Sequence, residues 1–179
     1  MEIHDAIELL RDAAGAGSGI WADLGAGTGT FTRALAASLV AGSTIYAVDD
    51  DARAVRALET LPRTPLVRVI AVQADFAQPF ELPGLGDTAL DGILFANSLH
   101  FVRDAQGALT RLVERLRPGG RAVVIEYDRR EASRWVPYPI PATRWPTLAT
   151  ASGLIGAKIT ATRPSAYQGI LYAGAATKP

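Results

Sequence analysis

Short hydrophobic runs alternate with amphipathic helical patterns along most of the chain. Near the N-terminus, Ile7, Leu10 and Ala14 recur at helical spacing, and a short apolar run over residues 20–24 then stops at glycine. Apolar runs of this length, bounded by turn residues, are typical of strands buried inside a sheet. The alternation continues through Tyr127. It predicts helices over 4–14, 31–40, 52–61 and 105–116, and strands over 20–24, 44–48, 66–72, 89–95 and 121–127.

The C-terminal part of the chain departs from this alternation. A loop over residues 129–144 carries three prolines, and a short helix is predicted to run through Leu148 and Leu154. Two β-like runs, near 157–162 and 169–176, then close the chain with no helix between them. Strand–helix alternation that ends in two consecutive strands is typical of a mostly parallel sheet with an antiparallel end. We therefore expect a doubly wound α/β fold.

Composition limits the class of protein. The chain has 179 residues, 49% of them hydrophobic, so we expect one domain, residues 1–179, with a sizeable buried core. The absence of cysteine excludes disulfide scaffolds, thiolate metal sites and cysteine nucleophiles. No uncharged stretch approaches the roughly 18 apolar residues that a membrane span needs, and the acidic N-terminus is unlike a signal peptide. These features predict a cytoplasmic protein with no membrane partner.

Charge is balanced over the whole chain but not along it. Residues 1–128 hold 11 basic and 17 acidic side chains, whereas residues 129–179 hold 7 basic and 1 acidic. A basic segment of this kind can meet an anionic partner such as RNA. The simpler interpretation, which we prefer, is that the two segments lie side by side and neutralise each other.

The clearest chemical signal is a glycine-rich turn after the first predicted strand. The sequence there is Asp23-Leu24-Gly25-Ala26-Gly27-Thr28-Gly29-Thr30. Glycines let the chain turn tightly and let backbone N–H groups approach a ligand closely. The dinucleotide fingerprint requires G-x-G-x-x-G, whereas the spacing here is G-x-G-x-G and Thr30 stands where the third glycine would fall. The spacing therefore disfavours a nicotinamide cofactor.

This turn resembles the first motif of the class I S-adenosylmethionine-dependent methyltransferases, acid-x-G-x-G-x-G, and the resemblance extends over about residues 18–128. In that family the glycine turn passes under the amino-acid portion and the ribose of the cofactor. The acid helps to hold the ammonium of the methionine part, directly or through water. The resemblance thus implies S-adenosyl-L-methionine as the cofactor. The residues it assigns to this end are Asp23, Gly25, Ala26, Gly27, Thr28 and Gly29.

Acidic positions also follow the second and third predicted strands. In the family, an acid at the end of the second strand accepts hydrogen bonds from both ribose hydroxyls, which suits the two oxygens of a carboxylate. Asp49 aligns best with this position and Asp50 is the alternative, whereas Asp51 is expected to cap the following helix. After the third strand, Asp75 corresponds to the acid beside the adenine amine, and Phe76 is expected to pack on the adenine ring.

The exit of the fourth predicted strand, ILFANSLHFV, resembles the small-molecule methyltransferases of the same family. Asn97 is expected to line the cofactor pocket with its backbone, because ligands of open α/β sheets bind at the carboxyl ends of strands. His100 has two interpretations, a general base or a residue that orients the loop. Asp91, at the opposite end of this strand, is interpreted as structural, and Glu126 and Asp128 flank the end of the fifth strand near the acceptor region.

The acceptor side is predicted to come from the N-terminal helix, the exit of the fourth strand and the loop Arg129–Arg144. Trp135 and Tyr138 on this proline-stiffened loop suit a pocket wall for a flat or apolar substrate. The alternative is that both aromatic rings simply pack on the sheet. No [Asn/Asp]-Pro-Pro-aromatic motif follows the fourth strand, which disfavours DNA amino-methylation, and no metal site is predicted.

The alternation and the resemblance together predict a three-layer α/β sandwich. We expect seven strands in the order 3-2-1-4-5-7-6, with the seventh antiparallel. The predicted function is methyl transfer from S-adenosylmethionine to a small-molecule acceptor. Two alternatives stay open, a cofactor-binding module that acts with a partner protein and an RNA methyltransferase. Because the chain is short for this family, we expect either that the acceptor reaches an open site or that a partner chain or a second copy closes the site.

Overall fold

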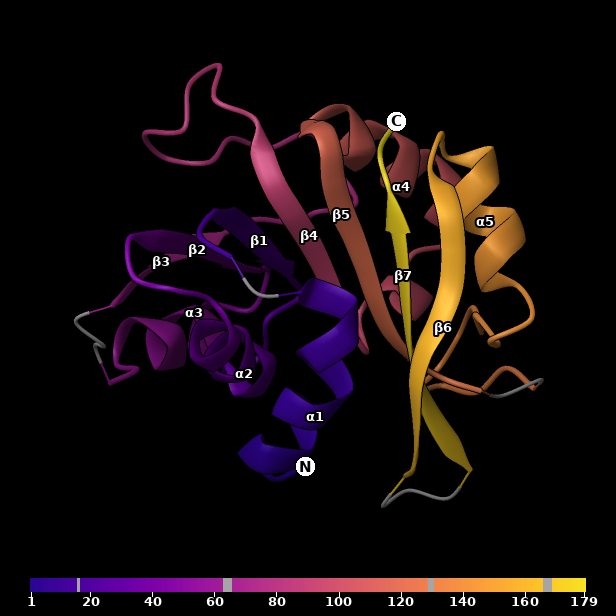
Figure 1. Cartoon of the computed structure of the whole chain (residues 1–179). Coiled ribbons are helices and arrows are strands. Elements are labelled where there is room, and N and C mark those ends of the chain that lie inside the picture. The colour runs from indigo at the N-terminus through magenta and orange to yellow at the C-terminus, as the bar shows by residue number, and fades with distance from the viewer. Residues whose placement is uncertain (16, 63–65, 129–130, 166–168) are drawn as a thin grey trace.

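A seven-stranded sheet lies between two layers of helices (Figure 1). This computed structural model describes residues 1–15, 17–62, 66–128, 131–165 and 169–179. The strands are β1 (Ile20–Leu24), β2 (Ser43–Asp49), β3 (Val67–Gln73), β4 (Leu90–Ala96), β5 (Leu116–Tyr127), β6 (Ile155–Pro164) and β7 (Ile170–Thr177). The helices are α1 (Ile3–Ala14), α2 (Thr30–Ser38), α3 (Ala52–Glu59), the 3-10 helix η1 (Leu99–Phe101), α4 (Ala105–Glu114) and α5 (Trp145–Ala151).

The strand order confirms the predicted fold. It runs β3-β2-β1-β4-β5-β7-β6. Strands β1 to β5 pair in parallel, and β7 is antiparallel to both of its neighbours. Within the described segments, no helix is long and apolar enough to cross a membrane.

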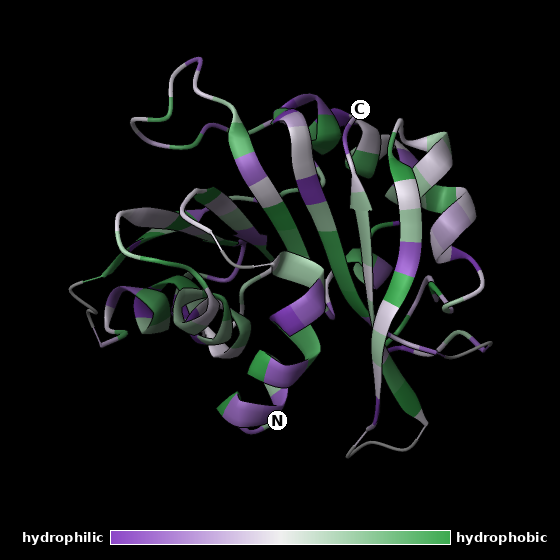
Figure 2. Ribbon diagram, viewed as in Figure 1, coloured by the Kyte–Doolittle hydropathy of each residue, from purple (hydrophilic) through white to green (hydrophobic). Residues whose placement is uncertain are grey.

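Each face of the sheet has its own hydrophobic core. Trp21 and Leu94 belong to the core that also contains the buried side of α1 and α2, whereas Ala22 and Phe95 belong to the core shared with α4 and α5. Figure 2 shows hydrophobic residues along most of the central strands. Since both faces are covered, these strands are apolar at consecutive positions, which is why the sequence contains runs and not strict alternation.

Most predicted boundaries lie within two residues of those in the structure, and two differ by more. Strand β5 begins at Leu116 and not at Arg121, because Leu116 pairs with Leu90 before the register shifts. Leu154 lies beyond α5, which ends at Ala151, and Gly153 follows in a left-handed conformation that stops the helix.

The parallel order brings the carboxyl ends of β1 to β5 to one edge of the sheet. Asp91 lies at the opposite edge, where its carboxylate accepts hydrogen bonds from the Ile20 N–H (2.7 Å) and from Arg117 Nε (2.6 Å). It therefore joins β4 to β1 and β5, which confirms its structural interpretation. The candidate chemistry lies at the other edge.

Candidate functional site

The glycine turn lies at the carboxyl end of β1 and leads into α2. The Gly25 and Ala26 N–H groups both donate to the Val48 carbonyl of β2, at 2.8 and 2.9 Å. Gly25 has φ +77°, and a Cβ added there would lie 2.4 Å from the Ser98 Cβ, so only glycine fits. Gly27 has φ +55° and open space where its Cβ would be. The turn is thus packed on one side and open on the other, with Thr28 exposed at its tip.

Asp23 is completely buried at the end of β1, beneath this turn. Its Oδ2 accepts a hydrogen bond of 2.6 Å from the Thr32 hydroxyl, but its Oδ1 has no partner. Burial, aided by the nearby Asp49 charge and opposed by the Thr32 hydrogen bond, raises the pKa of Asp23 to about 7. A cation reaching Oδ1 would compensate this carboxylate. Sequence analysis missed Thr32, although a hydroxyl in the first turn of the next helix is a usable signal.

Asp49 and Asp51 differ in the contacts that their carboxylates make. Asp49 ends β2, where its Oδ2 accepts from the Gly27 N–H (2.7 Å) and its Oδ1 accepts from the Asp51 N–H (3.0 Å). Asp51 caps α3 by accepting from the Arg53 N–H, as predicted. Asp50 is exposed, and within the described residues its side chain makes no hydrogen bond to the turn. Asp49 is therefore the carboxylate that the structure joins to the glycine turn.

Asp75 and Phe76 follow β3 at the same edge. Asp75 is exposed, and its Oδ1 accepts from the Ala77 N–H at 2.8 Å, which holds the carboxylate on a turn. Phe76 is buried against Phe95 at a centroid distance of 5.6 Å, and one edge of its ring approaches Gly25. The predicted adenine residues thus lie beside the turn, and Phe76 supports it from within.

Asn97 ends β4 in a left-handed conformation with φ +55°, the one described non-glycine residue with a positive φ. Its N–H donates to the Ile125 carbonyl of β5 (2.7 Å), and its side-chain Oδ1 is buried without a hydrogen-bond partner. The next residue, Ser98, donates its hydroxyl to the Leu24 carbonyl at 2.6 Å. This exit is therefore fixed by two adjacent strands, while the Asn97 amide is left without a partner.

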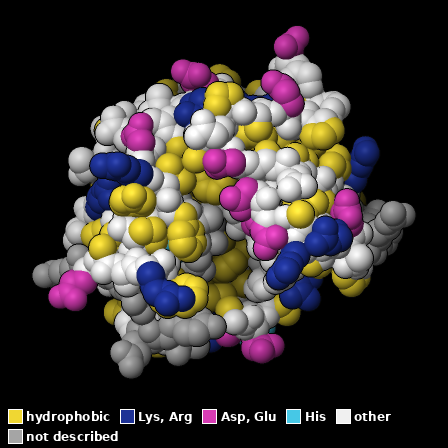
Figure 3. Space-filling model, turned by 180° about the vertical axis from the view of Figure 1, so that it is seen from behind, with side chains coloured by type: hydrophobic (Ala, Val, Ile, Leu, Met, Phe, Trp, Pro, Cys, Tyr) yellow, Lys and Arg dark blue, Asp and Glu magenta, His cyan; other side chains and the backbone are white. Residues whose placement is uncertain are grey.

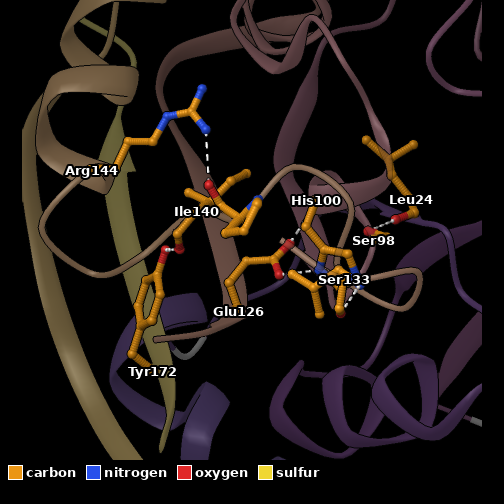
Figure 4. A network of polar contacts seen from close by, with 10 residues as sticks. Leu24, Ser98, His100, Glu126, Ser133, Ile140, Arg144 and Tyr172 are labelled. Atoms are coloured by element: carbon orange, nitrogen blue, oxygen red, sulfur yellow. Dashed lines mark hydrogen bonds and ion pairs between the residues drawn. The ribbon is translucent and has the colours of Figure 1, made fainter. Parts of the chain in front are cut away.

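His100 forms a buried pair with Glu126 (Figure 4). His100 Nδ1 lies 2.5 Å from Glu126 Oε2, and the His100 N–H donates to Glu126 Oε1 at 3.2 Å. Each residue is 1% exposed. Burial raises the pKa of Glu126, and the hydrogen bonds from His100 oppose that change. The geometry favours the orienting role of His100; the base role stays a prediction, and it requires access to Nε2.

The predicted acceptor loop is described from residue 131 onward, so Arg129 lies outside the described residues. One side of the loop packs inward through Val136 and Ile140, and the Tyr172 hydroxyl donates to the Ile140 carbonyl at 2.7 Å. The Tyr138 N–H donates to the His100 carbonyl at 3.0 Å. The loop is thus tied to η1 and to β7.

The two aromatic rings of this loop face outward. Trp135 is 68% exposed and carries the Arg134 guanidinium over its ring, and Tyr138 is 38% exposed. They do not pack into the sheet, which disfavours the alternative interpretation. The contact of Trp135 and Tyr138 with a substrate stays a prediction.

A cavity of about 540 Å³ lies beside this edge, between α1, the start of α2 and the ends of β4 to β7. Its wall includes Phe31, Asn97, Tyr127 and Leu171, together with the ion pair of Asp5 and Arg163. Trp135 and Tyr138 are not among the described residues that line it. Seen from behind, the surface is hollowed near its lower edge, and acidic side chains gather beside the hollow (Figure 3).

The donor set of the site suits an organic ligand. Among the described residues, no three His, Asp or Glu side chains lie close enough together to hold a metal ion. The site instead has an open glycine turn between two carboxylates on neighbouring strands. The unpartnered Asp23 Oδ1 can accept a hydrogen bond from a cationic group, and the Asp49 carboxylate can accept from hydroxyl groups.

Comparison with known families places the chain. Residues 22–122 match the methyltransferase domain family, and because this match covers more than half of the chain, the protein belongs to that family. The matched segment contains the glycine turn and the acids that end or follow β1, β2 and β3, namely Asp23, Asp49 and Asp75. The protein is an S-adenosylmethionine-dependent methyltransferase, and its family implies use of that cofactor. Comparison with curated protein sequences gives no match.

Solved structures agree with the fold. An S-adenosylmethionine-dependent methyltransferase from Thermotoga maritima is 18% identical with a TM-score of 0.73, covering 99% of this chain and 90% of its own. The [4+2]-cyclase SpnF is 17% identical with a TM-score of 0.71, covering 99% and 80%. A methyltransferase in complex with the Haloferax volcanii activator Trm112 is 15% identical with a TM-score of 0.69, covering 98% and 88%. At these identities the likeness concerns the fold alone.

Proposed function

We propose that this methyltransferase transfers the methyl group of S-adenosylmethionine to a small-molecule acceptor. The observation that carries the proposal is the pair of acids around the glycine turn. Asp23 keeps one buried oxygen without a partner, and Asp49 on the next strand holds the turn through the Gly27 N–H. The first suits the cofactor's ammonium, and the second suits the two ribose hydroxyls.

The remaining cofactor contacts follow from the strand order. Gly25 to Gly29 would pass under the methionine and ribose portions, since the turn is open at Gly27. Asp75 would accept from the adenine amine, and Phe76 would border the ring at the end of β3. Asn97 would line the pocket with its backbone, which Ile125 already holds in place.

The reaction asks chiefly for alignment from the protein. When bound, the cofactor supplies an electrophilic methyl group on a sulfonium that leaves as a neutral thioether. The chain's own task is to hold the donor and the acceptor in line, which can lower a barrier by roughly 7–11 kcal/mol. The buried His100–Glu126 pair supports this task by fixing η1 and, through the Tyr138 N–H, the loop that follows β5. Trp135 and Tyr138 do not line the cavity beside α1, and they are proposed to contact the acceptor outside it, from that loop.

RNA methylation is less well supported, because three of the five described basic side chains of the C-terminal segment are engaged within the chain. Arg163 pairs with Asp5, Arg144 donates to the Pro139 carbonyl, and Lys178 donates to the carbonyls of Glu114 and Leu116. Groups engaged in this way do not form a phosphate-binding surface. A partner chain stays a second proposal, supported by the complex of one structural neighbour with an activator.

Two measurements test the proposal in sequence. Calorimetry should give binding of S-adenosylhomocysteine, the demethylated product, and no comparable binding of NAD. Incubation of the protein with methyl-labelled S-adenosylmethionine and a cell extract should then label a low-molecular-weight product. Labelled RNA in place of a small molecule would support the alternative, and failure to bind the demethylated product would overturn the proposal.

A further inference from the structure

The cavity between α1 and the β6–β7 hairpin carries information about the acceptor. It adjoins the exit of β4, contains Asn97, and is bounded at its other side by Tyr127 and Leu171. Its volume, about 540 Å³, lies in the range of small-molecule pockets. The cavity therefore has the place and the size of a site for a compact organic molecule.

The apolar part of the wall is built from large side chains. Phe31 at the start of α2 and Leu171 at the start of β7 are both buried, and the half-buried Tyr127 lies at the end of β5. They come from three elements that the sheet order brings together. Large apolar side chains of this kind pack favourably against a flat or aliphatic ligand, but they do little to stabilise a charged ligand.

The charged part of the wall is already neutralised. Arg163 Nη1 lies 2.5 Å from Asp5 Oδ1 and 3.9 Å from Glu8 Oε2, so α1 and β6 are joined across the rim. Arg163 is the one cationic side chain among the described residues that line the cavity. An anionic acceptor would have to displace Asp5 from Arg163 or remain unpaired, and both are unfavourable.

The polar part of the wall includes Thr30, Ser165 and the side-chain amide of Asn97. Asn97 lines the cavity, and its Oδ1 is buried without a donor. The residue also keeps a left-handed backbone conformation that non-glycine residues rarely adopt. Asn97 thus combines a strained backbone with a buried hydrogen-bond acceptor that has no partner, and it lies in a cavity wall. Residues that bind ligands often have these features.

We propose that this cavity binds the methyl acceptor, that the acceptor is a neutral and largely apolar molecule, and that it donates an N–H or O–H hydrogen bond to the Asn97 amide oxygen. This inference rests on the proposed function, since it names the substrate class of the same site. It gives Asn97 a substrate-binding side chain in addition to the backbone contact with the cofactor. It also gives Asp5 a specificity role, because its ion pair keeps Arg163 from attracting anions.

Three related probes test the inference by ligand-detected NMR on the protein saturated with S-adenosylhomocysteine. 2-Naphthol is neutral and donates an O–H, 2-methoxynaphthalene is neutral without a donor, and 6-hydroxy-2-naphthoate carries a charge. We expect 2-naphthol to bind roughly fivefold to tenfold more tightly than the methoxy compound, which is the effect of one hydrogen bond. The naphthoate should bind at least as weakly as the methoxy compound.

Variants assign these differences to residues. Asn97→Gly keeps a left-handed backbone and removes the amide, so it should abolish the advantage of 2-naphthol over 2-methoxynaphthalene. Asn97→Asp, which keeps an acceptor oxygen, should preserve that advantage. Asp5→Asn should strengthen binding of the naphthoate, because it leaves Arg163 with only the more distant Glu8. Asp12→Asn, an exposed change on the same helix, should alter none of these affinities.

The outcomes separate this inference from the proposed function. The inference is overturned if the unaltered protein binds the naphthoate more tightly than 2-naphthol. It is also overturned if the advantage of 2-naphthol over 2-methoxynaphthalene persists in Asn97→Gly or is lost in Asn97→Asp. No detectable binding of 2-naphthol at millimolar concentration also overturns it. In each case, binding of S-adenosylhomocysteine leaves the proposed function standing. Failure to bind S-adenosylhomocysteine instead overturns the proposed function itself.

Discussion

The two ends of the proposed active site are built in different ways. The turn and acids assigned to the methionine and ribose parts of the cofactor all lie between Asp23 and Asp49, on two adjacent strands and the turn between them. The acceptor cavity instead takes its wall from distant parts of the chain, from Asp5 on α1 to Leu171 on β7. The cofactor end is thus encoded by a local motif, whereas the acceptor end exists only in the assembled fold.

This contrast also concerns stability. The cofactor end contains a buried acid with an unpartnered oxygen and a turn that tolerates no Cβ at Gly25. The acceptor end is satisfied by ion pairing and by ordinary apolar packing, apart from the Asn97 amide. Substitutions at the cofactor end should therefore alter both the stability of the protein and its affinity for the cofactor. Substitutions at the acceptor end should be able to alter one of these quantities without the other.

Asp23→Asn is expected to have the largest effect. Because burial raises the pKa of Asp23 to about 7, the folded state keeps a proton that the unfolded state releases near pH 4. The stability from that proton is complete below about pH 4 and is lost as the pH rises to about 7. Urea unfolding should find the variant more stable than the unaltered protein at pH 8, by up to about 4 kcal/mol.

The difference in the free energy of unfolding between Asp23→Asn and the unaltered protein must depend on pH. It should shrink steadily between pH 7 and pH 4, while the exposed Asp50→Asn serves as a control with no such trend. Affinity for S-adenosylhomocysteine should fall in Asp23→Asn, since the ammonium loses its carboxylate. A stability difference that is constant with pH would contradict the buried, protonated Asp23.

Gly25→Ala should come next in size. The added Cβ would meet Ser98 in a left-handed backbone conformation, so we expect the free energy of unfolding to fall by about 3 kcal/mol. Gly27→Ala is the matched control, because it has a similar φ but open space, and should cost about 1 kcal/mol. Denaturant unfolding of both variants checks this; equal losses would mean that contact with Ser98 does not matter.

Asp49→Ala should weaken binding of S-adenosylhomocysteine by about 1–3 kcal/mol, because the ribose hydroxyls lose their acceptor. Asp50→Ala changes the exposed neighbour and should leave the affinity unchanged. Calorimetry on both variants compares the two acids directly. The reverse pattern would assign the ribose to Asp50.

The smallest effect on stability is expected at the acceptor loop. Trp135→Ala combined with Tyr138→Ala should change the free energy of unfolding by only about 0.5 kcal/mol, since both rings face outward. Affinity for S-adenosylhomocysteine should be nearly unchanged, while turnover of the acceptor found by labelling should fall. Val136→Ala, a buried change in the same loop, should instead lower stability by about 2 kcal/mol. Unchanged turnover in the double variant would remove both rings from the acceptor site.

The amino-acid sequence by itself determined the fold and marked the turn and the acids that are proposed to bind the cofactor. Apolar runs predict strands covered on both faces, and the glycine spacing with Asp23 and Asp49 marks the turn, because tight turns and strand-end acids depend on residues that are neighbours in the chain.

The tertiary structure decided the rest. It paired His100 with Glu126, placed Asp5 against Arg163, and left the Asn97 oxygen without a donor in a cavity wall. Such contacts join distant segments, so they depend on strand order, register and helix packing, which no local pattern specifies.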